Sequence, residues 1–188
     1  MNSGGYNPPE YDNTMSVVDL STMKELRKVE IAINLHRLKK DAYDRLWVSS
    51  RGNYGDVHSA LYCLENEEIV RKFDVAVSDF QIVGDSLYYF GSEWNYSTGK
   101  NSVGFGVIDL KTLAPASTDI FNAKEIESMQ TPYGIIVNPY DHDFYLMDAK
   151  NYVSSGELLH FLSDGTFDWR VRTGDIPSRA AFVKKKKI

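Results

Sequence analysis

The chain lacks most features that would fix a compartment or a catalytic centre. It contains a single cysteine, Cys63, so the sequence allows neither an intrachain disulfide nor a cysteine-based metal site. No apolar stretch approaches the roughly 20 residues that span a bilayer. The first residues, Met1 to Gly5, have neither the basic nor the apolar segment of a signal peptide. We therefore expect no transmembrane segment and no signal peptide in this sequence.

Positive charge is also scarce. The formal net charge of −5 argues against nucleic acid as a partner, because phosphate binding needs a basic face. The strongest basic cluster lies at the end of the chain, and we assign residues 184–188 to a basic, solvated C-terminal tail. With 43% hydrophobic and 25% charged residues, the composition is typical of a folded chain and not of a disordered one.

What the sequence does contain is a repeat of strand pairs. Residues 15–20 match residues 59–64 at an offset of 44, and the segments that follow them align at the same offset. Further copies begin at 107–110 and at 158–162. Each copy consists of two short β-branched or aromatic runs joined by a polar turn, and another such pair precedes each of the last three copies.

The repeat predicts an all-β fold, a β-propeller of four-stranded antiparallel blades, because four strands about every 45 residues is the spacing of propeller blades. With the strands of a blade named A to D, residues 1–183 run CD, ABCD, ABCD, ABCD and a final A strand at Arg179–Val183, or about four blades. Helix is expected only within 123–129, for one or two turns. The alternative is a β-sandwich with accidental similarity between its strands.

A repeat that begins at strand C leaves two interpretations open. The final A strand could pair with the first CD unit and close a ring of four blades, which is at the lower end of what closes. Alternatively, N-terminal blades are missing and the remaining arc exposes a sheet edge. We favour the missing blades.

The B–C connections are the candidate functional loops. In a propeller they emerge on the same face as the D–A connections, because antiparallel strands alternate their ends. Three of the four contain Asn-Tyr at matching positions. Aromatic rings give large contact area at low entropy cost, and asparagine supplies both a donor and an acceptor. The loops supply these candidate ligand-binding residues: Tyr6, Arg51, Asn53, Tyr54, Glu93, Trp94, Asn95, Tyr96, Lys150, Asn151 and Tyr152.

Two alternatives stay open for these side chains. The Asn-Tyr pairs could stabilise the blades, with asparagine binding the loop backbone and tyrosine packing on the next blade. Arg37 and Arg179, which we add to the ligand-binding candidates, could bind anionic ligand groups. For each arginine taken singly, a salt bridge with Asp79, Glu93 or Asp175 is the favoured alternative.

No motif singles out a reaction. His142, between Asp141 and Asp143, resembles a metal-ligand cluster but lies in a predicted A–B turn, away from the candidate loops. No histidine has a serine or cysteine partner in a recognisable nucleophile motif, and no glycine-rich phosphate loop precedes a helix. We expect no catalytic residue, no metal site and no cofactor, and hence a protein that is not an enzyme.

Four segments resemble the YncE-like, DUF5074-type β-propellers. They are residues 2–13, Leu46-Trp-Val-Ser-Ser-Arg-Gly-Asn-Tyr54, Asp148-Ala-Lys-Asn-Tyr-Val-Ser-Ser-Gly156 and residues 173–177. That family is seven-bladed and typically carries a lipoprotein signal, which implies that about three N-terminal blades are absent here. The resemblance implies a protein of the outer surface or periplasm of a Gram-negative bacterium. Relatives include the BtuG-type lipoproteins, which capture cobalamin and hand it to an outer-membrane transporter.

These observations lead us to expect a non-catalytic ligand-capture module. A corrinoid such as cobalamin is the leading ligand and an outer-membrane transporter is the expected partner. The first alternative is a protein-interaction platform of a surface complex, in which the same loops bind a protein. A propeller lyase or hydrolase is the weaker alternative, since it would need histidines and carboxylates gathered around the central axis.

Overall fold

The computed structural model describes residues 1–95, 100–117, 120–121 and 124–183, with the backbone alone described at 93–95, 100–102 and 117. The chain divides into two compact units, Met1–Val77 and Ser78–Ile188. Among the residues described, no helix has the length and apolar character needed to span a membrane.

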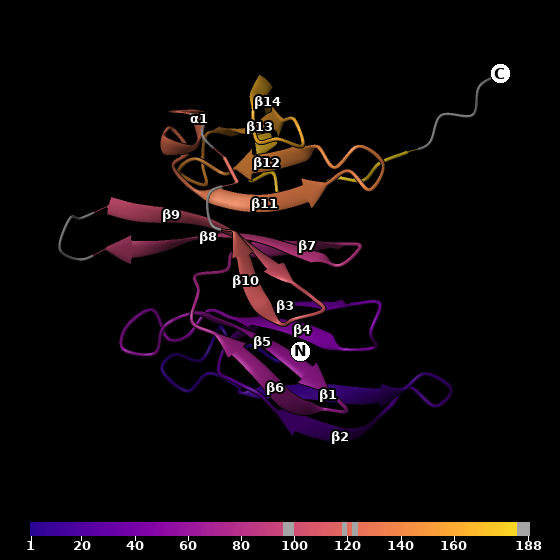
Figure 1. Cartoon of the computed structure of the whole chain (residues 1–188). Coiled ribbons are helices and arrows are strands. Elements are labelled where there is room, and N and C mark those ends of the chain that lie inside the picture. Colours follow the sequence, from indigo (N-terminus) through magenta and orange to yellow (C-terminus); the bar gives the residue numbers. More distant parts are fainter. Residues whose placement is uncertain (96–99, 118–119, 122–123, 184–188) are drawn as a thin grey trace. The chain divides into compact units, whose positions relative to one another are not determined.

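Unit 1 contains two antiparallel sheets (Figure 1). The first has two strands and the second has four, each strand pairing with its neighbour in sequence. The first sheet consists of β1 (Thr14–Asp19) and β2 (Lys24–Glu30), and the second of β3 (Leu35–Lys40), β4 (Leu46–Ser50), β5 (Ala60–Glu65) and β6 (Glu68–Phe73).

Unit 2 contains two four-stranded antiparallel sheets with the same sequential order of strands. The first consists of β7 (Asp79–Val83), β8 (Ser86–Asn95), β9 (Lys100–Asp109) and β10 (Ala114–Ser117). The second consists of β11 (Pro132–Val137), β12 (Phe144–Asp148), β13 (Ser155–Phe161) and β14 (Phe167–Asp175). The short helix α1 (Lys124–Glu127) precedes β11, within the segment where a turn of helix was expected.

The prediction of an all-β chain built from four-stranded antiparallel blades is confirmed. The first sheet has only the two strands of the expected CD unit, and the other three have all four. The expected final A strand at Arg179–Val183 does not form, since these residues belong to no strand. A strand needs a partner for its backbone N–H and C=O groups. Pro177 and Ser178, which precede these residues, pass so close to Gly156 and Gly134 that a Cβ on either glycine would clash with them.

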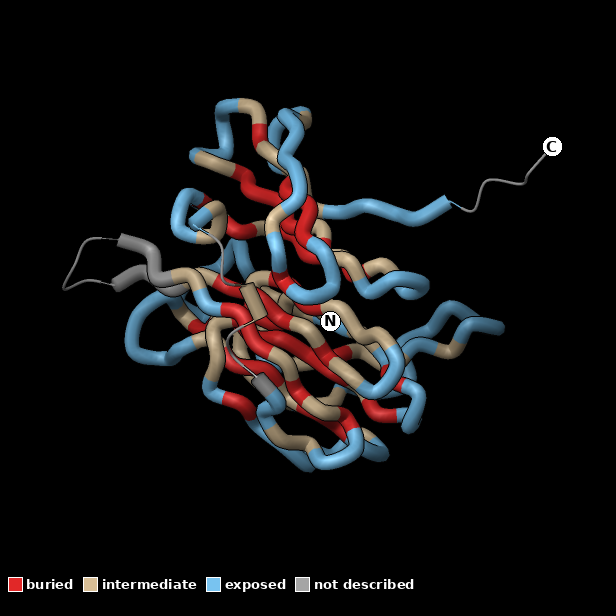
Figure 2. Tube along the Cα trace, turned by 45° about the horizontal axis from the view of Figure 1, so that its top comes forward, coloured by how far each residue is buried: buried red, intermediate tan, exposed pale blue. Residues whose placement is uncertain are grey.

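The core of unit 1 is built mainly from the middle strands of its four-stranded sheet. Met15, Leu35, Val48 and Leu64 are buried together. Trp47, which is fully buried, stacks on Phe73 with 5.8 Å between ring centroids. Figure 2 shows the burial following the middle of the strands, while the turns at their ends are exposed. The middle strands β4 and β5 are buried along most of their length, whereas the edge strands β2 and β6 are mostly exposed.

Aromatic rings form the core of unit 2. Phe121 lies 4.9 Å from Phe105, 5.0 Å from Phe144 and 4.8 Å from Phe161, measured between ring centroids. These side chains come from β9, β12, β13 and the connection after β10, so the cluster joins the two sheets of the unit. The edge-to-face and tilted arrangements are those that aromatic pairs prefer.

A buried ion pair fixes the β3–β4 turn. Asp41, whose side chain is 0% exposed, lies 2.8 Å from the guanidinium of Arg45. Its carboxylate also accepts the indole N–H of Trp47 at 3.0 Å and the backbone N–H of Tyr43 at 2.9 Å. Burial raises the pKa of Asp41, but the hydrogen bonds from Trp47 and Arg45 outweigh it and hold the pKa below its ordinary 3.8.

Replacing Asp41 with alanine should therefore destabilise the protein strongly. The variant leaves a buried guanidinium and a buried indole N–H without their acceptor, so we expect the free energy of unfolding to fall by about 3–5 kcal/mol. Urea unfolding followed by tryptophan fluorescence measures the change. The matched control is Lys40→Ala, because Lys40 pairs with Asp44 on the surface and should cost no more than about 1 kcal/mol. Similar losses for both variants would contradict the assignment.

The lowered pKa of Asp41 also predicts that the stability of the protein depends on pH. Because the pKa of Asp41 is lower in the folded than in the unfolded state, its contribution is complete above the ordinary pKa of 3.8. The contribution is lost as the pH falls through the folded-state pKa. Wild-type stability should therefore decrease below pH 3.8 more steeply than that of Asp41→Ala.

Candidate functional site

Two B–C loops, one in each unit, have left-handed residues at the same two positions. Gly52 and Lys150 are the second residues after β4 and β12, and their φ angles are 63° and 51°. Tyr54 and Tyr152 are the fourth residues, with φ angles of 59° and 64°. Both loops thus place a tyrosine in the left-handed region, where a residue with a Cβ carries about 1 kcal/mol or more of conformational strain.

Equivalent hydrogen bonds hold both loops. The backbone N–H of Arg51, the first loop residue, donates to the carbonyl of Asn34 at 3.1 Å, and that of Ala149 donates to Thr131 at 2.9 Å. The side chains of Asn34 and Thr131 return a bond to the carbonyl of the second loop residue, at 3.0 and 2.5 Å. Each loop is therefore tied at both places to the residue that precedes the inner strand of its sheet.

The asparagine of each Asn-Tyr pair folds its own loop. The side-chain oxygen of Asn53 accepts the backbone N–H of Gly55 at 3.0 Å and of Val57 at 2.9 Å. Asn151 likewise accepts the N–H groups of the second and third residues after it, at 3.0 and 2.8 Å. Such side-chain turns substitute for backbone turns. The side-chain oxygens of both candidates are thus engaged within the loop.

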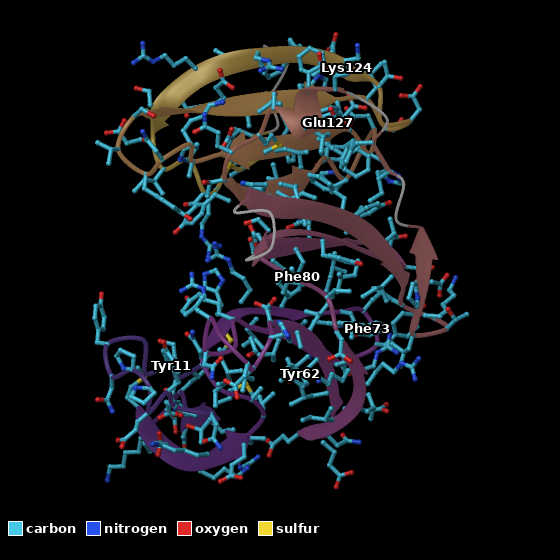
Figure 3. All side chains as sticks on the ribbon, turned by 90° about the vertical axis from the view of Figure 1, so that its left-hand side faces the viewer. Tyr11, Tyr62, Phe73, Phe80, Lys124 and Glu127 are labelled. Carbon is cyan, nitrogen blue, oxygen red and sulfur yellow. The ribbon has the colours of Figure 1, made fainter. Side chains whose placement is uncertain are left out.

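The tyrosines point outward and are backed by a second tyrosine. Tyr54 is 63% exposed and meets the ring of Tyr11 edge-on, with 6.5 Å between centroids. Tyr152 is 50% exposed and meets Tyr133 in the same way at 5.7 Å. Figure 3 shows Tyr11 on the N-terminal loop of unit 1. Each unit therefore presents a pair of tyrosine rings at the equivalent B–C loop.

Bulges in the inner strands bring further side chains to these loops. The pairing of β3 with β4 shifts register between Leu35 and Leu38, and that of β11 with β12 shifts between Pro132 and Gly134. A bulge re-aims the side chains beside it and is common next to functional sites. In unit 1 the bulge includes His36, whose Nε2 lies 2.7 Å from the guanidinium of Arg51. In unit 2 the bulged residue is Tyr133, the partner of Tyr152.

The other two expected B–C loops differ from this pair. Pairing of β8 with β9 continues to Asn95 and Lys100, so residues 93–95, which were expected in a loop, belong to a strand (Figure 1). Glu93, Trp94 and Asn95 are the last residues of β8, and Tyr96 lies outside the described residues. In the N-terminal loop the side chain of Tyr6 is fully exposed.

Buried charges support the loop of unit 2. Lys150 lies 3.0 Å from Asp148 and 2.6 Å from Glu157. The buried carboxylate of Asp148 also accepts the backbone N–H groups of Gln130, Thr131 and Lys150. Burial raises the pKa of Asp148 and lowers that of Lys150, yet these contacts outweigh burial and shift both pKa values the other way. Both groups stay ionised and serve the loop backbone.

Arg37 and Arg179 are the two remaining candidates. Arg37, in the β3 bulge, donates its backbone N–H to the hydroxyl of Ser49 at 3.0 Å. Arg179 is exposed and lies outside any strand. In the described part of the chain, no three histidine, cysteine or acidic side chains come together as a metal site. Asp143 instead contacts His160 at 3.1 Å.

The sequence did not identify three of the side chains at these loops as ligand-binding candidates. Tyr11 and Tyr133 back the exposed tyrosines, and His36 holds Arg51. A sequence signal existed for Tyr133 and His36, since both were expected in the D–A connections, on the same face as the B–C loops. Their contacts depend on the bulges, which leave no local pattern in the sequence.

Comparison with known proteins supports the fold. No family model matches the chain, and no curated protein is similar to it. The hydrazine synthase of Kuenenia stuttgartiensis is similar in structure, with a TM-score of 0.65 and 13% identity over 86% of this chain and 44% of that one. A protein of unknown function from Bacteroides caccae has a TM-score of 0.58 and 10% identity over 97% of this chain and 60% of that one. The chain thus spans about half the length of these structures, and the likeness shows the fold alone.

Replacing Tyr54 or Tyr152 with asparagine should leave stability nearly unchanged. Asparagine tolerates the left-handed region, so relief of about 1 kcal/mol of strain offsets the loss of an aromatic pair worth about 0.5–1.5 kcal/mol. We expect the free energy of unfolding of each variant to stay within about 1 kcal/mol of wild type in urea titrations.

The matched control is Tyr89→Asn. The ring of Tyr89 is buried and covers Gly106 on the neighbouring strand, so this variant should lose about 3 kcal/mol or more. A loss of that size at Tyr54 or Tyr152 would show that the loop tyrosines serve the fold.

Proposed function

We propose that the protein captures a small-molecule ligand on a tyrosine-bearing B–C loop without transforming it. The observation that carries this proposal is the pair of exposed tyrosines, Tyr54 and Tyr152, held at strained backbone positions by otherwise well-bonded loops. Strained residues tend to gather at binding sites. A ring fixed in advance loses little conformational entropy when a ligand covers it.

The acidic groups of the two loops support a binding role more than a catalytic one. The hydrogen bond from Asn53 lowers the pKa of Asp56, and backbone N–H groups lower the pKa of the buried Asp148. A general base works best with a pKa near the operating pH. Carboxylates with lowered pKa values are weak bases, and these two act as acceptors for their own loops.

A corrinoid is the leading ligand, by resemblance to the YncE-like propellers. A corrinoid has a broad, largely apolar ring face that tyrosine rings can cover, and amide groups at its edge that pair with polar loop groups. By the same resemblance, we place the protein at the outer surface or in the periplasm of a Gram-negative bacterium. An outer-membrane transporter would receive the ligand there.

Titration of the protein with cyanocobalamin tests this proposal. We expect binding at micromolar concentration or below by isothermal calorimetry. Tyr54→Leu and Tyr152→Leu are tested singly, and at least one should raise the Kd about tenfold, because lost ring contacts cost roughly 1–2 kcal/mol. Tyr140→Leu is the matched control, since Tyr140 is 71% exposed but lies in the β11–β12 turn, at the other end of the strands.

Absence of binding at micromolar concentration would remove the corrinoid from the proposal. Pull-down with the intact protein then decides between ligand classes. If Tyr54→Leu or Tyr152→Leu abolishes capture of a surface protein while no small molecule binds, the loops form a protein-interaction platform.

A further inference from the structure

We infer that the ligand bound at the β4–β5 loop carries an oxyanion, a carboxylate or a phosphate, which pairs with Arg51. The inference rests on the proposed function and names the ligand chemistry of one of its two loops. It follows from how Arg51 is held, from the lack of a carboxylate partner among the described residues and from the comparison with the equivalent loop of unit 2.

Arg51 is fixed by a neutral partner. Its guanidinium lies 2.7 Å from Nε2 of His36, in the bulge of β3. Arginine can only donate hydrogen bonds, so Nε2 accepts and the imidazole is neutral, with its proton on Nδ1. Unlike a carboxylate, a neutral ring orients the guanidinium and leaves its whole positive charge in place.

Among the side chains that the structure describes, no acidic group neutralises this charge. Within the described residues, the side chain of Arg51 contacts His36 and forms no ion pair with a carboxylate. The acidic groups of the surrounding loops are engaged elsewhere, Asp12 with Thr14 and Asp56 with Asn53. Because Arg51 is half-buried, its charge is partly removed from water, which is unfavourable until an anion pairs with it.

The loop backbone does not require an arginine here. The equivalent position in unit 2 is Ala149, which is fully buried and makes the same backbone hydrogen bond. The two loops share their φ pattern and their bonds to the inner strand, so the side chain of Arg51 is an addition to a scaffold that is complete without it.

The chemistry of guanidinium then selects the ligand group. With one donor on His36, the remaining N–H groups of the planar fork can bind two oxygens of a carboxylate or phosphate at once. Tyr54, in the same loop, and Tyr11 beside it supply aromatic surface. The expected ligand therefore combines an oxyanion with an apolar or aromatic ring.

Three small probes on the full chain test this inference: phenyl phosphate, benzoate and the neutral benzyl alcohol. Binding is followed by NMR shifts of the backbone amides of residues 51–58. We expect both anions to bind at least about tenfold more tightly than benzyl alcohol, because hydrogen bonds to charged groups are the stronger ones. The better of the two anions identifies the oxyanion as phosphate or carboxylate.

The preference for anions should disappear in Arg51→Ala, which copies the equivalent residue of unit 2. Arg51→Gln is the second variant, because glutamine can still donate to His36 without carrying a charge. Arg71→Ala is the control: it removes a positive charge from an exposed position on β6 of the same unit and should keep the preference.

Two outcomes overturn the inference. If benzyl alcohol binds as tightly as the anions, or if the preference survives in both Arg51 variants, aromatic capture stands and the oxyanion does not. If none of the three probes shifts the amides of residues 51–58, the inference also fails, and the corrinoid titration then decides the proposed function independently.

Discussion

The shape of each candidate loop depends on one backbone hydrogen bond, which has an equivalent in the other unit. The first residue after strand β4 or β12 donates its N–H to the residue that precedes the inner strand, Asn34 or Thr131. This bond turns the chain back over the end of its own sheet, and the left-handed residues that follow are the consequence of so tight a return. The inner strand bulges at the same point, which brings His36 and Tyr133 beside the loops.

In the proposed site, stability and ligand recognition depend on different side chains within these loops. Asn53, Asn151 and Asp148 direct their oxygens at backbone N–H groups, which would otherwise have no partner near the sheet end. The tyrosines next to the two asparagines contribute little to the core, since they are half or more exposed. A loop made rigid by some residues can hold others in strained positions, and it is these that a ligand can use.

The sequence was informative where the signal was local. Strand pairs and polar turns repeat in phase, so the blades could be predicted, and Asn-Tyr marked the two folded loops correctly. The third Asn-Tyr misled, because pairing of β8 with β9 runs on to Asn95 and no local pattern says where a ladder stops. Arg179–Val183 has strand-like composition but forms no ladder. The bulges, and with them the roles of His36 and Tyr133, depend on register between strands, which only the folded sheet defines.

The two equivalent loops show how one backbone can carry different chemistry. Where unit 2 has Asp148 at the end of its strand, unit 1 has Ser50, whose hydroxyl accepts the same loop N–H without a charge. Lys150, the cationic side chain of the unit 2 loop, is consequently neutralised by Asp148 and Glu157. This loop therefore offers mainly aromatic surface. The unit 1 loop lacks that carboxylate, and its cationic side chain, Arg51, keeps its charge. Arg51 is the first residue after its strand, whereas Lys150 is the second, and its guanidinium lies against the neutral ring of His36. A change from carboxylate to hydroxyl at one structural position therefore separates a charge used for folding from a charge available to a ligand.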